Sequence, residues 1–262
     1  MSSGPEKISR TYRFAMAVCT PVIRWWGRLE VSGLEHLPTS GPVLLSSNHD
    51  SYWDPVAIGI AGLPRRQIRA LAKSTLWNFP GLGPILNGMG QVPIERGAGD
   101  AHALDTAIEH LRAGECIGVF PEGTTTRGRT LRARSGFGRL AQAVPETAIV
   151  SCTVTGTVDI ARFPKRPRIK VDFYSPKGRG LGEGETPGEL SVRLLAEARA
   201  RAPIATSGRK RTVAKRQAAL REAEAEAEAD ADASGDQAAA GSDAAAATET
   251  AGAAEAGPSG PP

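Results

Sequence analysis

The stretch Pro42-Val43-Leu44-Leu45 is a short apolar run, and two residues later it leads into Asn48-His49-Asp50-Ser51-Tyr52-Trp53-Asp54. A second apolar run, Cys116-Ile117-Gly118-Val119-Phe120, leads into Pro121-Glu122-Gly123-Thr124. Short apolar runs bounded by turn residues are typical of buried strands. In an open α/β sheet, residues just beyond the carboxyl ends of the strands meet in one crevice. The sequence therefore predicts that both polar segments face the same site.

The rest of the chain, up to about Pro203, alternates short apolar runs with helical patterns. That alternation predicts an α/β fold, a mixed sheet flanked by helices. The expected strands are 29–33, 42–47, 67–72, 91–95, 116–120, 149–155 and 168–174. The expected helices are 54–62, 100–113, 135–144 and 188–201.

The polar segments suit acyl transfer to a hydroxyl group. A neutral imidazole removes an alcohol proton near pH 7, so His49 is the candidate general base. Asp54 lies across a turn into a helix and can fold back to hold the second ring nitrogen. Asp50 is the rival partner, ranked lower because adjacent side chains usually diverge. The alternative for the pair is a purely structural hydrogen bond.

Four segments in order carry a family resemblance. They are Asn-His-x-Ser-x-x-Asp at 48–54, Ala-Lys-Ser-x-Leu at 72–76 with Pro-Gly-Leu-Gly at 80–83, Gly-Gln-Val-Pro-Ile-Glu-Arg at 90–96 and Phe-Pro-Glu-Gly-Thr at 120–124. Over about residues 30–175 the chain resembles the glycerolipid acyltransferase family. The resemblance implies that family's α/β fold, with His49 and Asp54 as the catalytic pair.

The resemblance implies an O-acyltransferase that esterifies a lysophospholipid, in the first place 1-acylglycerol-3-phosphate to phosphatidic acid. The acyl donor would be acyl-coenzyme A or acyl-carrier protein, and no metal or bound cofactor is implied. One alternative keeps the chemistry but takes another lysolipid or an amino-acid lipid as acceptor. A second alternative is a non-catalytic lipid-binding protein, against which the intact His49–Asp54 pair argues.

A phosphorylated acceptor needs positive charge and N–H donors. Arg96 can bind a phosphate with two parallel hydrogen bonds, and Lys73 can add a point charge. Gly123 lets the backbone approach closely, and the N–H groups of Gly123 and Thr124 can donate. Glu122 is expected to accept from an acceptor hydroxyl or to position Arg96. The plain alternatives are a strand-exit turn at Glu122-Gly123 and a solvated or Glu95-paired Arg96.

The chain departs from the family pattern at two places. Where the family usually has Arg-Ser after Glu-Gly-Thr, this chain has Thr125-Thr126, and Arg127 and Arg129 follow. The fourth family motif usually carries a Pro in its strand, and residues 149–153 contain none. Both departures bear on recognition of the acceptor headgroup.

Charge divides the chain into unlike parts. Residues 222–262 hold ten acids and no Lys or Arg, whereas 204–221 hold six basic residues and no acid. Residues 1–203 also carry a net positive charge, which suits an anionic membrane surface or a phosphorylated substrate. Nucleic acid would suit the charge, but no nucleic-acid-binding signature is present and aromatic residues are few. The Ala-rich acidic segment has too little apolar surface to fold and is expected to be a disordered tail.

The three cysteines, Cys19, Cys116 and Cys152, lie in apolar surroundings without metal-ligand spacing. They are typical of reduced core residues in a cytosolic protein.

No apolar run reaches 18 residues, so no transmembrane helix is expected. The expected location is peripheral, on the cytoplasmic face of the cell membrane.

The first 28 residues show helical periodicity. An apolar stripe faces away from Arg10, Arg13, Arg24 and Arg28, and Pro21 is expected to divide the helix into two pieces. The stripe consists of Ile8, Tyr12, Ala15, Met16, Cys19, Val22, Ile23 and Trp26. It predicts either a helix in the membrane interface or a helix that caps the core, and the resemblance favours the membrane. The expected organisation is therefore 1–28 membrane-associating helices, 29–203 acyltransferase domain and 204–262 basic segment and tail.

Overall fold

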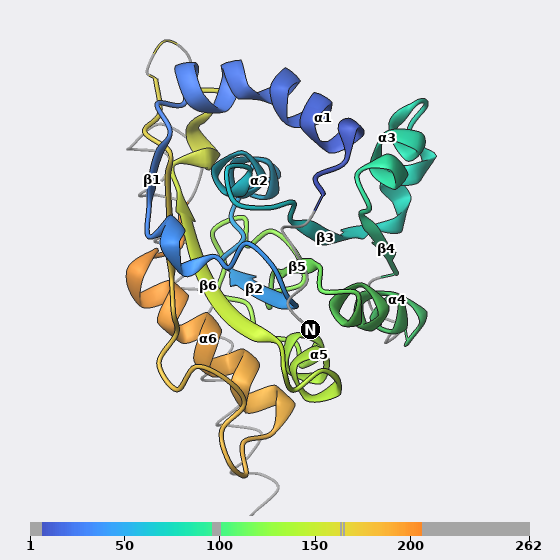
Figure 1. The fold of residues 1–262 in the computed structure, drawn as a ribbon. Coiled ribbons are helices and arrows are strands. Elements are labelled where there is room, and N and C mark those ends of the chain that lie inside the picture. The colour runs from blue at the N-terminus through green and yellow to red at the C-terminus, as the bar shows by residue number, and fades with distance from the viewer. Residues whose placement is uncertain (1–6, 96–100, 163, 165, 206–262) are drawn as a thin grey trace, which may run out of the picture. The chain divides into compact units, whose positions relative to one another are not determined.

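A seven-stranded mixed sheet with helices on both faces forms the centre of the fold (Figure 1). The structure, a computed structural model, describes residues 7–95, 101–162, 164 and 166–205. The strands are β1 (Glu30–Ser32), β2 (Val43–Ser47), β3 (Arg69–Lys73), β4 (Val92–Ile94), β5 (Cys116–Val119), β6 (Ala148–Thr155) and β7 (Lys170–Tyr174). Their order is β1-β7-β6-β2-β5-β3-β4, and β6 and β7 pair antiparallel while the other neighbours are parallel. The predicted α/β fold class is confirmed.

Six α-helices accompany these strands within the described residues. They are α1 (Arg10–Thr20), α2 (Asp54–Gly62), α3 (Leu82–Gly88), α4 (Ala101–Arg112), α5 (Gly136–Ala143) and α6 (Pro187–Arg201). The expected strands and the helices α2, α4, α5 and α6 lie where the sequence placed them, within a few residues. The helix α3 was not expected, because Gly83, Pro84 and Gly88 give it the composition of a loop.

Successive side chains of β2 point to opposite faces of the sheet, and each face is covered by its own hydrophobic core. Val43 and Leu45 point to the face covered by α1 and α2. Leu44 points to the opposite face, which is covered by α4, α5 and α6. Successive side chains on a strand point to opposite faces, so a continuous apolar run is what a strand buried on both sides requires.

The same strand positions the polar segments. β2 lies between β6 and β5 and is parallel to both, with Ser46 level with Val119 of β5. The carboxyl ends of β2 and β5 are therefore neighbours at the same edge of the sheet. The loop that follows β2 and the turn that follows β5 meet there, as the two apolar runs predicted.

The N-terminal helix packs differently from the membrane interpretation. Tyr12, Met16 and Ile23 are almost completely buried and belong to the core on the α2 side of the sheet. Gly59 of α2 makes this close approach possible, since a Cβ there would lie 2.8 Å from the Tyr12 hydroxyl and 3.0 Å from the Met16 sulfur. The apolar stripe thus caps the core, and the expectation that this stripe enters a membrane is corrected.

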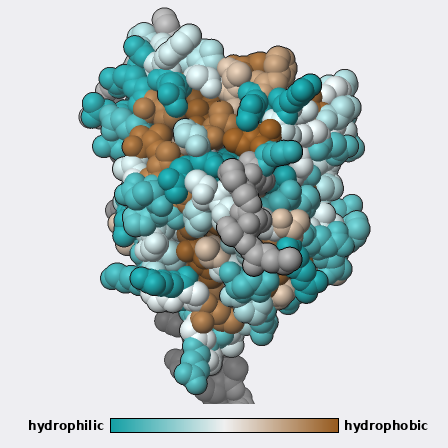
Figure 2. Space-filling model, viewed as in Figure 1, coloured by the Kyte–Doolittle hydropathy of each residue, from teal (hydrophilic) through white to brown (hydrophobic). Residues whose placement is uncertain are grey.

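Another face of the same segment is exposed and also apolar. Phe14, Val18 and Trp25 are each more than 60% exposed. Arg10, Arg13 and Arg24 are exposed with them. In Figure 2, apolar surface gathers in the upper part of the view, over α1 and α2. Whether this face meets a membrane remains a prediction.

Helix geometry changes at Pro21, where the sequence predicted a break. α1 ends at Thr20, and a π-helix spans Pro21–Trp26. Proline has no N–H group and cannot continue the ladder of bonds four residues apart. The wider turn shows in the bond from the N–H of Gly27 to the carbonyl of Val22, five residues back.

Two further expectations meet the structure only in part. None of the described helices combines the length and apolar character needed to cross a membrane. Residues 206–262 lie outside the described residues, so the predicted basic segment and acidic tail stay predictions.

Close packing between α5 and α6 sets the position of the last helix. The N–H of Gly138 donates to the Ser191 hydroxyl at 3.2 Å. A Cβ on Gly138 would lie 1.9 Å from the carbonyl oxygen of Pro187, the first residue of α6. A capping box of Thr186 and Glu189 begins α6 at that point. Any side chain at residue 138 must therefore push α6 away from α5.

Gly138→Ala should destabilise the fold by about 1–3 kcal/mol, because overpacking forces a backbone shift. Gly136→Ala is the matched control in the same helix, since its Cβ would have 4.0 Å of space to the nearest atom, a Leu104 methyl carbon. Urea unfolding of both variants measures the difference. Equal stability of the two variants would contradict the close packing of α5 on α6.

Candidate active site

His49 and Asp54 lie side by side in the loop after β2. The His49 Nδ1 is 3.1 Å from Oδ2 of Asp54, and both side chains are buried. Asp54 opens α2, so the turn between strand and helix folds the carboxylate back toward the ring. Asp50 turns elsewhere, so Asp54 and not its rival contacts the imidazole.

The surroundings of Asp54 assign the histidine tautomer. Its Oδ2 accepts the backbone N–H groups of Asp50 at 2.7 Å and Ser51 at 2.8 Å. Its Oδ1 accepts the hydroxyl of Thr157. A carboxylate surrounded by donors acts as an acceptor toward His49 as well, so Nδ1 carries the proton. Nε2 then presents a lone pair, and within the described residues it has no protein partner.

Backbone anchors hold the histidine loop on the sheet. The Asn48 amide donates to the carbonyl of Val154 at 2.8 Å and accepts the Val154 N–H at 2.9 Å. The N–H of Thr126 donates to the His49 carbonyl at 2.9 Å, and its hydroxyl donates to Asp50 at 2.6 Å. The loop is therefore fixed from β6 on one side and from the segment after β5 on the other.

Glu122 contributes to this loop rather than to an open surface. Its Oε2 accepts the backbone N–H of His49 at 2.7 Å, and its Oε1 accepts the guanidinium of Arg199. Burial raises the pKa of Glu122, and the charge of Arg199 opposes that shift. Both oxygens of the carboxylate thus have protein partners. Oε2 has a single partner and a carboxylate oxygen can accept a second hydrogen bond, so the expectation that Glu122 accepts from an acceptor hydroxyl stays a prediction.

The turn after β5 depends on its glycine. Gly123 has φ +68°, a conformation that favours glycine. Its N–H closes the turn by donating to the Phe120 carbonyl at 2.9 Å, so that group is not available to a ligand. Within the described residues no protein acceptor pairs with the N–H of Thr124, which stays a candidate donor.

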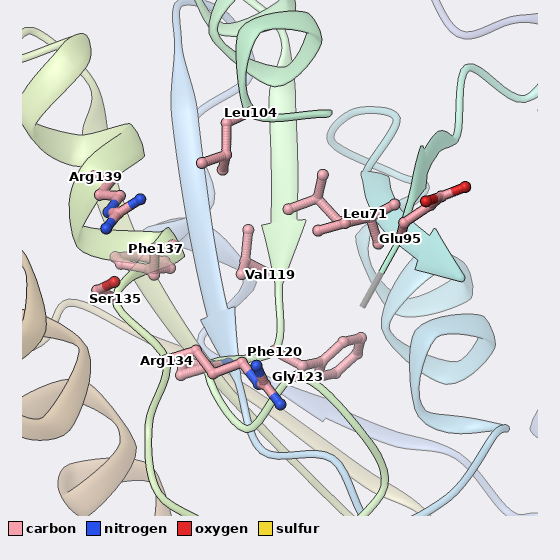
Figure 3. A pocket seen from close by; sticks show the side chains of 13 residues that line it. Leu71, Glu95, Leu104, Val119, Phe120, Gly123, Arg134, Ser135, Phe137 and Arg139 are labelled. Carbon is pink, nitrogen blue, oxygen red and sulfur yellow. The ribbon is translucent and has the colours of Figure 1, made fainter. Parts of the chain in front are cut away.

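A cavity of about 250 Å³ opens beside this turn, and Figure 3 shows the side chains around it. Its wall is largely apolar, and Phe120 links it to the histidine, because the two rings stack with centroids 4.1 Å apart. The apolar lining comprises Leu71, Ile94, Leu104, Val119, Phe120 and Phe137. A cavity of this kind suits a hydrocarbon chain.

One cation stands at the turn itself. The Arg134 side chain runs beside Gly123 and lines the cavity (Figure 3). Its Cδ and Nε lie 2.7 Å from where a Cβ on Gly123 would be, so only glycine leaves room for this arrangement. Arg134 is exposed, and within the described residues no carboxylate pairs with it. It is therefore free to meet an anion.

Lys73 and Arg96 are the remaining predicted site residues. Lys73 is exposed at the end of β3, two residues beyond Leu71 of the cavity wall. Within the part of the chain that the structure describes, no hydrogen bond or ion pair joins Lys73 to His49. Arg96 lies outside the described residues, so its role stays a prediction.

The motifs did not point to three residues of the site. Arg199 and Thr157 are far from the histidine loop in sequence, and Arg134 lies outside the four segments that carry the family resemblance. The departure from the family pattern at Thr125-Thr126 did indicate a position that matters to the site. Thr126 is fully buried and binds Asp50, which shows that a hydroxyl at this position belongs to the loop structure.

Several known proteins are similar to this chain in sequence. Residues 28–155 match the model of the Acyltransferase family. A lyso-ornithine lipid O-acyltransferase of Pseudomonas aeruginosa is 30% identical over 205 residues, which cover 74% of each protein. A 1-acyl-sn-glycerol-3-phosphate acyltransferase of Bacillus subtilis is 25% identical over 165 residues, covering 63% of this chain and 72% of the relative. The chain also spans less than half the length of several mycobacterial relatives that it matches.

A solved structure supports the fold. It is that of the 1-acyl-sn-glycerophosphate acyltransferase PlsC of Thermotoga maritima. The match has a TM-score of 0.51 and 21% sequence identity and covers 75% of this chain and 86% of that one. At this identity the likeness concerns the fold alone.

Proposed function

Because the chain belongs to the glycerolipid acyltransferase family and is therefore an O-acyltransferase, we propose that it esterifies the free hydroxyl of a lysophospholipid. The proposed acceptor is 1-acylglycerol-3-phosphate, and the product is phosphatidic acid. The proposed donor is acyl-coenzyme A or acyl-carrier protein, with no bound cofactor. The observation that carries the proposal is the His49–Asp54 pair beside an apolar cavity.

The proposed chemistry needs one base and no enzyme nucleophile. Nε2 of His49 takes the proton of the acceptor hydroxyl as its oxygen bonds to the thioester carbonyl carbon. Asp54 stabilises the imidazolium that forms. The C–S bond then breaks, and the imidazolium returns its proton to the departing sulfur. Water is kept from the ring by its burial and by the stacked Phe120.

The two substrates place different demands on the site. An acyl chain fits the apolar cavity on the far side of Phe120. The acceptor phosphate needs a cation near the Gly123 turn, and Arg134 is the described cation best placed for it. A guanidinium binds phosphate through two parallel hydrogen bonds. Arg96 and Lys73 stay predicted partners of the same phosphate, with the Thr124 N–H as a further donor.

A second acceptor class is an amino-acid lipid of the lyso-ornithine type. It is favoured by the Pseudomonas relative, which matches over 74% of its length. It is also favoured by Thr125, which stands where the family usually has an arginine. A panel of both acceptors, each with the same acyl donor, decides between them. Faster transfer to lyso-ornithine lipid than to 1-acylglycerol-3-phosphate would replace the first proposal with the second.

The proposed membrane contact is the exposed face of Phe14, Val18 and Trp25 with its neighbouring arginines. Apolar and aromatic side chains beside basic ones are typical of helices that lie in the membrane interface. This contact would let a peripheral enzyme take its acceptor from an anionic bilayer. The cytoplasmic face of the cell membrane is the proposed location.

His49→Ala should lower the rate of acyl transfer by about 10²–10⁴-fold, the contribution of a general base. Asp54→Asn should also lose most of the rate, because the wrong tautomer would be favoured. Thiol release from acyl-coenzyme A with acceptor present measures both. His102→Ala, in an exposed position of α4, is the control. Normal turnover by a folded His49→Ala variant would refute the mechanism.

Arg134→Met should raise the KM for 1-acylglycerol-3-phosphate more than it lowers kcat, because it removes binding that is equal in ground and transition states. Arg134→Lys should restore only part of the acceptor affinity, because an ammonium is a point charge and cannot form the two parallel hydrogen bonds of a guanidinium. Arg132→Met, an exposed neighbour that does not line the cavity, is the control. An unchanged acceptor KM in Arg134→Met would remove this residue from the phosphate site.

Replacing Phe14, Val18 and Trp25 together by Ser should weaken binding to phosphatidylglycerol-containing vesicles by more than about tenfold. Fully burying one large apolar side chain contributes about 1.5–3 kcal/mol, and tenfold corresponds to about 1.4 kcal/mol. Val192→Ser on α6 is the control, because Val192 is a similarly exposed apolar residue. Sedimentation with vesicles measures the difference, and equal binding of both variants would show that α1 does not meet the membrane.

A further inference from the structure

The last helix of the domain sends one buried cation into the active site. Arg199 lies near the end of α6, beyond the residues that match the family model. Its Nη1 and Nη2 each donate to one oxygen of Asp50 at 2.9 Å, a bidentate pair. Its Nε donates to Oε1 of Glu122 at 2.8 Å, and Nη2 contacts the same oxygen. A single guanidinium thus bridges the two carboxylates on either side of His49.

No donor of this guanidinium is left over for a substrate. A guanidinium has five N–H donors. Four of them meet Asp50 and Glu122 as described, and the fifth reaches the carbonyl of Ala202 at 3.3 Å. The side chain is also only 15% exposed. Arg199 therefore differs from Arg134, which is exposed beside the cavity.

The carboxylates that Arg199 holds are the ones that shape the histidine loop. Glu122 accepts the backbone N–H of His49, and Asp50 accepts the hydroxyl of Thr126. Asp50 also donates its own N–H to Asp54, the partner of the imidazole. Every step from α6 to the ring is therefore a hydrogen bond between described residues, and a change at Arg199 reaches His49 through two routes.

Electrostatics makes the cation necessary. Asp50 and Glu122 are both buried carboxylates, and burial raises the pKa of Glu122 while Asp50 adds to that shift. Burial also tends to lower the pKa of Arg199, but the two carboxylates outweigh it and the pKa is raised. Without the guanidinium, two like charges would be buried close together with no counter-ion, which is costly.

We propose that Arg199 is a positioning residue for the transfer reaction, and that α6 completes the active site by holding Asp50 and Glu122 around the His49 loop. The inference rests on the proposed role of His49 as base. It differs from a purely structural ion pair, because it predicts an effect on the chemical step in molecules that are fully folded.

The test compares Arg199→Met and Arg199→Lys with Arg201→Met, all in the full chain. Arg201 lies two residues on in α6 and pairs with Asp172 and Glu197 at the surface, so it controls for loss of an arginine from this helix. The measurements are kcat and both KM values from pH 5 to 9, about the working range of a histidine base. Thermal unfolding gives the folded fraction of each variant.

Arg199→Met should lower kcat on the order of 10²-fold with both KM values little changed, the cost of a misplaced base. The charge of Arg199 lowers the pKa of Glu122, so its loss should raise that pKa further. The acidic limb of the kcat profile should therefore move to higher pH. The groups that face this carboxyl are Asp50, Arg199 and the backbone of His49. Arg199→Lys should restore part of kcat, and Arg201→Met should resemble the parent.

Three results would overturn the inference. One is a parent-like kcat and pH profile in folded Arg199→Met, and another is a loss that merely follows the unfolded fraction. The third is a raised acceptor KM with unchanged kcat, which would make Arg199 a binding residue. An active His49→Ala variant would instead remove the proposed function, so the two failures are distinguishable.

Discussion

The buried carboxylate of Asp54 is the acceptor around which the histidine loop closes. It stands at the start of α2, where the helix dipole favours negative charge. A buried carboxylate without donors is costly, so the chain must bring donors to it. The backbone of residues 50 and 51, the Thr157 hydroxyl and the His49 ring supply them. Closing the turn and orienting the imidazole are therefore one physical event.

The parts of the fold that followed from the sequence have strong local signals. The runs that became β2 and β5 are apolar throughout because both faces of the sheet are covered. Because these strands pair in parallel, their carboxyl ends lie at the same edge of the sheet, and His49 and Glu122, which follow them, come together there. β6 pairs with β2 and β7 on its two sides, and residues 149–153, none of which is Pro, all keep an N–H group for this pairing.

Other features depend on contacts that no local pattern reports. Helical periodicity identified the apolar stripe of the N-terminal helix and left open whether a membrane or the core covers it. It could not show that α2 covers the stripe, or that Phe14, Val18 and Trp25 form a separate exposed face. The Glu-Gly-Thr motif located Glu122 without indicating that both of its oxygens are engaged. Arg199 is 149 residues from Asp50, and only the folded chain joins them.

The position of α6 at the end of the described domain orders the assembly of the enzyme. Domains form as the chain leaves the ribosome from its N-terminus, so every segment with a recognisable motif emerges before Arg199 does. Until α6 seats against Gly138, Asp50 and Glu122 are two carboxylates without their counter-ion. A chain cut at residue 155 would carry all the family motifs and yet lack the cation that holds them together. Under the proposed role of Arg199, acquiring activity and finishing the fold are the same step.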